Sequence, residues 1–299
     1  MKNVSHEGVI VPLVTPATAD GRLDEAAAER LVAHVVGQGC GLLIAGTTGE
    51  VASLPEAARR RFVEIAVRVT ARRVPVLACI AHNCFADSVA LGREHLRAGA
   101  DAVVAMLPNY FKLEPAEMES YFAQLADATP GPLYLYNIPP TTGMSIPLDV
   151  IEAVAARPNV IGLKDSENTA GRAEALAQRF AGRSDFALFM GFAAHSAAAM
   201  KMGFRGFVPS SGNLRPDISA RLFTAARAGD WTLAEKLQHD ADATTALYAK
   251  GRTLGQSLAV LKSALALQGI CGPDMFPPLM PLSAGAREAL RPLLDTLPR

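Results

Sequence analysis

Short apolar runs recur along the chain, and most of them are followed by a segment with helical spacing. The runs are nearly continuous in apolar residues and are bounded by Gly, Pro or Asn. This pattern is typical of parallel strands that are buried on both faces, because a strand with one wet face alternates apolar and polar residues. The predicted strands are Val9–Val14, Gly41–Ala45, Val76–Ile80, Ala102–Leu107, Leu133–Tyr136, Val160–Lys164, Ala187–Met190 and Gly206–Val208.

The segments between the strands carry the start signals of helices. Asp24 is the predicted N-cap of a helix over 25–36, and prolines mark further starts at Pro55, Pro115, Pro147 and Pro216. Eight strands that alternate with helices predict an α/β fold, a closed (β/α)8 TIM barrel. A doubly wound open sheet is the alternative. Such a sheet usually carries a glycine-rich dinucleotide turn after its first strand, and residues 9–16 contain none.

The alternation ends near Gly229. Beyond it, Asp230–Tyr248 and Leu254–Gly269 have helical spacing with no strand between them, and a proline-rich tail follows. We therefore divide the chain into a catalytic (β/α)8 barrel, residues 1–229, and a C-terminal helical extension, residues 230–299. We expect the extension to support packing or oligomer formation, and not to form a second catalytic domain.

Composition limits the classes of partner. Lys+Arg and Asp+Glu both number 29 in 299 residues, so the formal net charge is zero, which argues against a nucleic-acid partner. The chain lacks a signal-peptide pattern and any apolar run long enough to cross a membrane, which predicts a cytoplasmic protein with no membrane contact. The four cysteines form no CxxC pair and are expected to be buried free thiols of a reducing compartment.

The histidines give no indication of a metal site, because the six show neither HxH nor HExxH spacing. We therefore predict that the chain needs no metal. Three of them fall in helical runs and are expected on solvated helix faces: His34, His95 and His239.

Catalytic groups of such barrels lie at the C-terminal ends of the strands and in the loops that follow. Lys164 ends an apolar run, although lysine is much rarer than arginine in this chain. Burial favours the free amine over the ammonium ion, and a free amine can attack a ketone to form a Schiff base. The alternative is a lysine that pairs with Asp165 or reaches solvent. Tyr136 ends the preceding strand and can move the protons that this chemistry requires, unless it is only a packed aromatic.

A glycine- and threonine-rich turn follows the second predicted strand. The sequence GTTG at 46–49 offers backbone N–H groups and two hydroxyls, which together can bind a carboxylate or phosphate. An ordinary strand-to-helix turn is the alternative.

Three blocks together resemble the dihydrodipicolinate synthase / N-acetylneuraminate lyase family: GTTGE at 46–50, YNIP at 136–139 and GLKD at 162–165. The last two place their tyrosine and lysine one βα unit apart, and the resemblance covers essentially the whole chain. It implies an enzyme of the class I type, which forms Schiff bases with 2-oxo acids. It also implies no organic cofactor, and a homotetramer built as a dimer of dimers.

The resemblance also implies roles for individual residues. Lys164 is then the lysine that condenses with the C2 ketone of pyruvate or another 2-oxo acid, and Tyr136 is the general acid/base. Thr47 joins the proton relay, which Tyr110 completes from across a dimer interface. Two further contributions concern binding: Thr48 with Gly49 holds the substrate carboxylate, and Val208 offers a main-chain carbonyl near the lysine.

Two positions differ from well-known members of this family. Synthases carry an arginine after the YNxP motif that binds the carboxylate of the aldehyde partner, and Thr141 takes its place here. Neuraminate lyases carry an acidic pair after the glycine that follows the seventh strand, whereas Gly191 is followed by Phe192 and two alanines. Together with Ser166 and Ser210, these residues predict a modestly polar distal pocket.

We therefore predict a metal-independent lyase or aldolase that performs aldol cleavage, aldol condensation or dehydration on a 2-oxo acid, such as a 2-keto-3-deoxy sugar acid. One alternative is a genuine dihydrodipicolinate synthase, which condenses pyruvate with aspartate semialdehyde held by another arginine. The other is a non-catalytic homologue that only binds 2-oxo acids.

Overall fold

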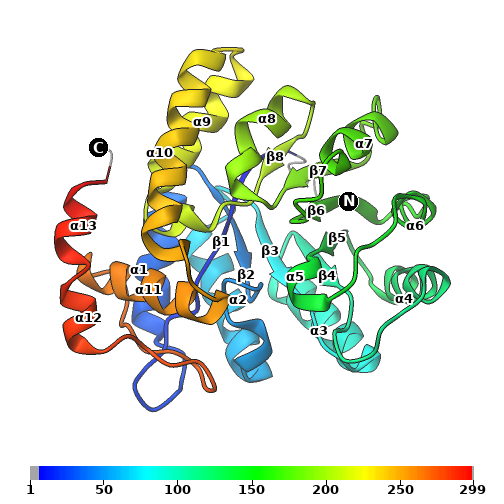
Figure 1. Ribbon diagram of the computed structural model, residues 1–299. Coiled ribbons are helices and arrows are strands. Elements are labelled where there is room, and N and C mark those ends of the chain that lie inside the picture. The colour runs from blue at the N-terminus through cyan, green and yellow to red at the C-terminus, as the bar shows by residue number, and fades with distance from the viewer. Residues whose placement is uncertain (1–6, 298–299) are drawn as a thin grey trace.

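Eight parallel strands form a closed barrel at the centre of the computed structural model, which describes residues 7–297 (Figure 1). Each strand pairs with the next along the chain, and β8 pairs with β1. The (β/α)8 prediction is thus confirmed, and the open sheet is excluded. The strands are β1 (Gly8–Pro12), β2 (Gly41–Ile44), β3 (Val76–Cys79), β4 (Ala102–Met106), β5 (Leu133–Asn137), β6 (Val160–Asp165), β7 (Ala187–Met190) and β8 (Gly206–Phe207).

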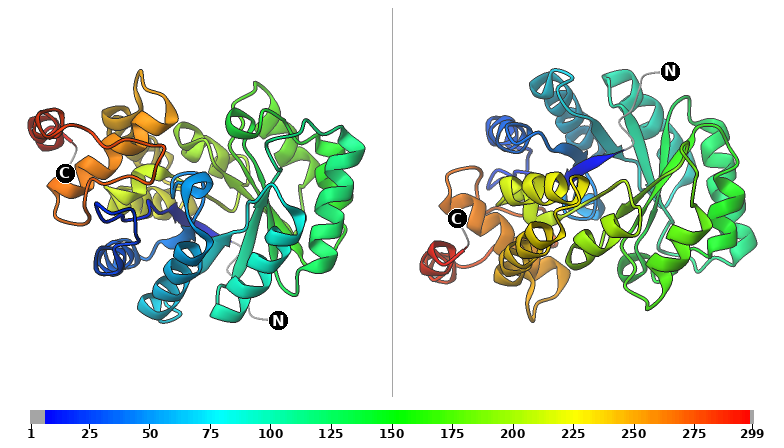
Figure 2. Two further views of the ribbon diagram at one scale, coloured as in Figure 1. Left: turned by 90° about the horizontal axis from the view of Figure 1, so that it is seen from below. Right: turned by 90° about the horizontal axis from the view of Figure 1, so that it is seen from above.

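Helices cover the outside of the barrel and begin where the sequence signals them (Figures 1 and 2). The Asp24 side chain caps the first helix by accepting from the Ala27 N–H, and Pro115 and Pro216 occupy first helical positions. The helices of the barrel are α1 (Glu25–Val36), α2 (Glu56–Thr70), α3 (Phe85–Ala98), α4 (Pro115–Ala128), α5 (Pro139–Thr142), α6 (Leu148–Val154), α7 (Arg172–Arg179), α8 (Ser196–Lys201) and α9 (Pro216–Arg227), with 3-10 turns η1 (Val51–Ser53), η2 (Ala193–His195) and η3 (Ser210–Asn213).

The predicted C-terminal extension is helical and lies at one side of the barrel, beside α1 and α9 (Figures 1 and 2). It comprises α10 (Trp231–Ala249), α11 (Leu254–Leu267), α12 (Ala284–Glu288) and α13 (Arg291–Asp295). The helix α10 packs along α9, and α11 packs against α10. Arg30 of α1 donates a hydrogen bond to the Ile270 carbonyl just after α11, which ties the extension to the first βα unit.

Two apolar cores result from the alternation of side chains along the strands. The larger core fills the space between the strands and the helices. The smaller one fills the barrel interior and includes Leu43, Val104, Tyr134, Tyr136 and Phe189. A polar group at the mouth of this interior is therefore bordered by apolar side chains and shielded from water.

Two expectations about single residues need correction. Cys84 is exposed, although the other three cysteines are buried and all four are free. His95 is fully buried and not on a solvated face, because it shares the inward face of α3 with Ser88 and Leu91. Between residues 7 and 297, no helix combines the length and apolar character that a membrane crossing requires.

Candidate active site

Tyr136 and Lys164 lie side by side at the C-terminal ends of β5 and β6. The two residues are register partners, and the Lys164 Nζ lies 3.9 Å from the centroid of the Tyr136 ring. Lys164 is 6% exposed and Tyr136 is 2% exposed. Asp165 forms its ion pair with Arg172, 2.8 Å away. The amine is therefore sheltered beside the phenol, and the reading in which Lys164 pairs with Asp165 or extends into solvent does not hold.

An irregularity in β6 turns Lys164 toward the barrel interior. The register between β5 and β6 shifts at its start, where Leu133 pairs with Val160 but Tyr134 pairs with Gly162. The extra residue, Ile161, shifts the alternation of all later side chains by one position. Without this bulge, Lys164 would point outward at the helices.

Gly191, at the end of β7, leaves the space that the lysine side chain uses. A methyl group at this position would overlap the Ser166 hydroxyl and would lie 2.9 Å from the Asp165 carbonyl oxygen and 3.1 Å from the Lys164 Cε. Such distances are far below normal van der Waals contact, so only glycine fits here without moving the lysine. Ser166 and Gly191 therefore lie beside Lys164, as a substrate pocket around the lysine would require.

The loop that follows β2 brings a threonine to the tyrosine. The Thr47 Oγ1 lies 3.4 Å from the Tyr136 hydroxyl, and either oxygen can donate. Among the described residues, the backbone N–H groups of Thr47 and Thr48 have no acceptor, whereas the Gly49 N–H donates to the Gly46 carbonyl. The N–H groups of this loop that are free to donate to an anion are therefore those of Thr47 and Thr48, whereas the Gly49 N–H is engaged within the turn.

Gly49 contributes to the loop through close packing. A methyl group there would lie 3.0 Å from the Leu13 carbonyl oxygen and 3.2 Å from the Thr15 hydroxyl. That hydroxyl donates a hydrogen bond of 2.7 Å to the Gly49 carbonyl. The loop is thus held against the segment after β1, which restricts its movement relative to the barrel.

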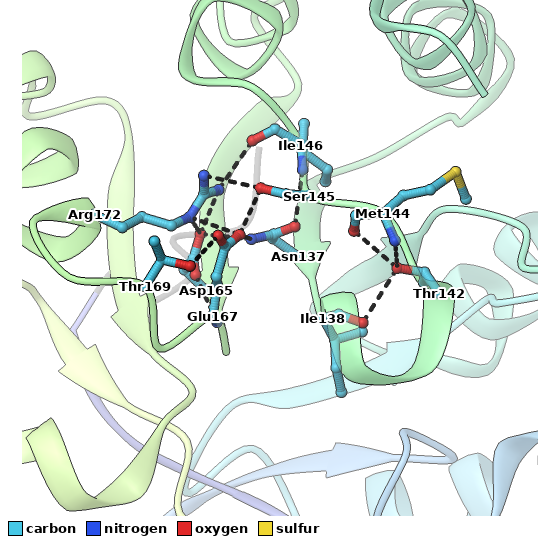
Figure 3. Close-up of polar contacts among 10 residues, drawn as sticks. All are labelled: Asn137, Ile138, Thr142, Met144, Ser145, Ile146, Asp165, Glu167, Thr169 and Arg172. Carbon is cyan, nitrogen blue, oxygen red and sulfur yellow. Dashed lines mark hydrogen bonds and ion pairs between the residues drawn. The ribbon is translucent and has the colours of Figure 1, made fainter. Parts of the chain in front are cut away.

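A partly buried polar network adjoins Lys164 in the chain, and sequence reasoning did not find it (Figure 3). Asp165 accepts hydrogen bonds from Arg172 and Asn137, and Arg172 also pairs with Glu167. Ser145 donates to Glu167 and accepts from Arg172. The network joins Asn137 and Asp165, the residues that directly follow Tyr136 and Lys164 in the chain, so it fixes how the ends of β5 and β6 lie relative to each other.

Burial and the neighbouring donors shift the pKa values of the two carboxyl groups of this network in opposite directions. Burial raises the pKa of Asp165, and the Arg172 guanidinium offsets only part of this effect. Burial also acts to raise the pKa of Glu167, but hydrogen bonds from Ser145 and Asn137 outweigh it and lower that pKa. The signal in the sequence was Asn137, the second residue of the YNIP block.

The remaining predicted site residues form hydrogen bonds with other partners or are exposed. Val208 is buried and its N–H donates to the Met190 carbonyl. The Thr141 hydroxyl donates to the Ile138 carbonyl within the turn of α5, and the Ser210 hydroxyl lies 2.7 Å from the Tyr248 hydroxyl of α10. Tyr110 is 78% exposed, beside the equally exposed Phe111, and is not part of the cluster within one chain.

Comparison with known proteins identifies the family. The model of the dihydrodipicolinate synthetase family matches residues 5–297. The chain belongs to this family. The resemblance carried by the three sequence blocks is thereby confirmed, and the family's named relatives are enzymes, which makes this chain a lyase-type enzyme.

Individual relatives cover nearly the full chain. A 4-hydroxy-tetrahydrodipicolinate synthase of Methanosarcina mazei is 31% identical over 93% of both chains. A dihydrodipicolinate synthase structure from Bacteroides thetaiotaomicron has 31% identity and a TM-score of 0.93, covering 99% of this chain and all of that one. YagE of Escherichia coli, named as a candidate 2-dehydro-3-deoxy-D-gluconate aldolase, was solved in complex with pyruvate; that structure has 29% identity and a TM-score of 0.91, covering 97% of this chain and 98% of that one.

Proposed function

We propose that this enzyme forms a Schiff base between Lys164 and the C2 ketone of pyruvate or another 2-oxo acid, and that it needs neither a metal nor an organic cofactor. The observation that carries the proposal is the sheltered Lys164 amine against the Tyr136 ring, with Thr47 at the phenol. The pyruvate complex of the relative YagE supports the choice of ligand.

The geometry suits the proton transfers of this reaction. The amine adds to the ketone, and Tyr136 donates a proton to the carbinolamine oxygen, so that water leaves as the C=N bond forms. The protonated imine withdraws electrons from C3. Either the Tyr136 phenolate takes the proton of the C4 hydroxyl and the C3–C4 bond breaks to give an enamine and an aldehyde, or a C3 proton is lost to give an enamine that attacks an aldehyde. Thr47 passes the proton between the Tyr136 hydroxyl and the Tyr110 hydroxyl that we propose to come from a neighbouring subunit.

The substrate carboxylate binds at the loop after β2. The Thr48 hydroxyl and the backbone N–H groups of Thr47 and Thr48 are the donors we assign to it. This contact orients the C2 ketone toward Lys164, which lowers the entropic part of the barrier. Val208 is buried in the barrel interior, and we assign its main-chain carbonyl to the surroundings of the lysine, as the family resemblance implies.

The distal pocket favours an aldolase or dehydratase of 2-keto-3-deoxy acids. Thr141 is neutral and its hydroxyl is engaged within α5, so it does not replace a guanidinium that grips a carboxylate in two places. Phe192 and the alanines after Gly191 leave that side of the pocket with little charge. The relative YagE, named for such an acid, is consistent with this choice.

A second candidate is 4-hydroxy-tetrahydrodipicolinate synthase itself, because several relatives at 30% identity or more bear that name. A coupled assay with pyruvate and aspartate semialdehyde separates the two. Turnover faster than with any 2-keto-3-deoxy acid would favour the synthase and would refute our argument from Thr141.

We also propose a homotetramer built as a dimer of dimers. The exposed pair Tyr110 and Phe111 stands with its ring centroids 5.0 Å apart, and burial of such an apolar pair favours association. Tyr110 would then reach Thr47 and Tyr136 of a neighbouring subunit. A cytoplasmic location completes the proposal, since the four cysteines are free.

The decisive experiment is reduction with borohydride in the presence of pyruvate, followed by peptide mass analysis. We expect one adduct, on Lys164, and none in Lys164→Ala, whereas Lys236→Ala removes an exposed lysine and serves as the matched control. Tyr136→Phe should retain slow adduct formation but lose most turnover on a panel of 2-keto-3-deoxy acids. A wild-type protein without an adduct on Lys164 refutes the proposal, and an adduct without turnover on any substrate favours the non-catalytic homologue.

A further inference from the structure

A fully buried ion pair joins the loop after β2 to the C-terminal extension. The Lys262 Nζ in α11 donates to the Glu50 Oε1 at 2.7 Å, and both side chains have no exposed surface. The second carboxylate oxygen of Glu50 accepts from the Phe276 N–H at 2.9 Å, and the Lys262 Nζ lies 5.5 Å from the centroid of the Phe276 ring. The groups that hold this carboxylate therefore come from the extension, 212 and 226 residues further along the chain.

The backbone of this loop needs such support. Glu50 has φ of 61° and Ala45 has φ of 55°, so a residue with a side chain adopts the left-handed conformation at each end of 46–49. This conformation is unfavourable for such residues and persists where the surroundings enforce it. At Glu50, the enforcing contacts are those with Lys262 and Phe276.

The ion pair also sets the charge near the substrate. Glu50 follows Thr48 by two residues, and Thr48 belongs to the proposed binding site of the substrate carboxylate. A buried Glu50 without a counter-charge would repel that carboxylate through a medium of low dielectric constant. Lys262 cancels this charge, so the loop can accept an anion.

We propose that Lys262 is a positioning residue for the 2-oxo acid: it fixes the conformation of the loop after β2 and neutralises Glu50, without touching the substrate. This inference rests on the proposed function. It gives the extension a part in substrate binding, beyond packing. A second contact between Tyr248 of α10 and Ser210 of η3 joins the extension to the loop after β8 as well.

The test measures the pyruvate concentration that gives half-maximal trapping by borohydride, together with the labelled fraction at saturating pyruvate. We expect Lys262→Met to raise the half-saturating concentration by about tenfold or more while full labelling is still reached. Glu50→Gln/Lys262→Met removes both charges and keeps an acceptor for the Phe276 N–H, so we expect a rise of only about threefold. Lys236→Met, an exposed lysine of the same extension, should behave as wild type.

The outcomes separate this inference from the proposed function. If wild-type protein traps no pyruvate on Lys164, the proposed function fails. Suppose that wild type traps pyruvate and that Lys262→Met folds. If the half-saturating pyruvate concentration of this variant is within twofold of the wild-type value, the positioning role is overturned. The same holds if the double variant is as impaired as the single one. Should Lys262→Met not fold, the double variant decides: about a threefold rise supports the role, and a wild-type value overturns it.

Discussion

Replacing Arg172 by methionine tests how much the buried ion pair of Arg172 with Asp165 contributes to stability. Arg172 is 8% exposed in its side chain and Asp165 is 3% exposed, so the substitution leaves a buried carboxylate without its counter-charge. Removing one partner of such a pair costs about 3 to 5 kcal/mol of unfolding free energy. Asp165 still accepts from the Asn137 side chain and the Glu167 N–H, which favours the lower end, about 3 kcal/mol.

The pH dependence of this loss identifies its cause. Burial already raises the pKa of Asp165, and loss of the guanidinium raises it further. The folded variant then binds a proton more readily than the unfolded chain does. The difference in unfolding free energy between wild type and Arg172→Met should therefore shrink as the pH falls toward the range in which Asp165 is protonated. A neutral carboxyl needs no counter-charge.

The assay is urea denaturation of wild type and Arg172→Met at several pH values. Arg179→Met is the matched control, because Arg179 lies on the same helix but pairs with the exposed carboxylates of Asp149 and Glu152. Exposed pairs contribute little to stability, so this control should stay close to wild type. The reasoning from burial is wrong if the two arginine variants lose the same unfolding free energy. It is also wrong if the loss of unfolding free energy in Arg172→Met does not change with pH.

Two further predictions follow from buried groups. Burial lowers the pKa of His95 from 6.5 to about 4, so the unfolded chain takes up a proton before the folded one does, and about 3 kcal/mol of unfolding free energy is lost as the pH falls from 6.5 to 4. His95→Leu should flatten this part of the stability profile in denaturation experiments, and an unchanged slope would contradict the assignment. Gly191→Ala should keep the fold but reduce borohydride trapping on Lys164 about tenfold or more, because the new methyl group displaces the lysine; undiminished trapping would show that the pocket adapts.

The sequence predicted the barrel because each buried parallel strand is a continuous apolar run, a signal that needs no partner to be recognised. Lys164 was singled out for a related reason, because a lysine at the end of such a run is unusual, and Tyr136 was chosen because it ends the preceding strand. The bulge at Ile161 could not be predicted, since it is a relation between β5 and β6 and leaves no mark in β6 alone. Helical spacing placed His95 in a helix but did not say which face is buried.

The sequence also did not predict the buried ion pairs between residues that the fold brings together. The pair of Arg172 with Asp165 was not predicted, although these residues lie seven positions apart, because a charged residue in a loop or at a helix start is most often solvated. Glu50 and Lys262 lie 212 residues apart, and nothing in either segment indicates the other. Such pairs become visible only when the topology brings the segments together.

The ketone and the carboxylate of a 2-oxo acid would thus be held by different parts of the chain. Under the proposed function, the ketone would face Lys164, whose direction depends on the β6 bulge and on the network around Arg172. The carboxylate would face the loop after β2, whose backbone we propose to depend on Lys262 in the extension. Formation of the Schiff base requires that the ketone and the carboxylate are both bound in position. A displaced Lys164 and a displaced loop after β2 should therefore both reduce Schiff-base formation. A barrel cut after residue 229 would keep every residue that we assign to substrate contact and still lack Lys262, the cation that we propose to let the loop accept an anion.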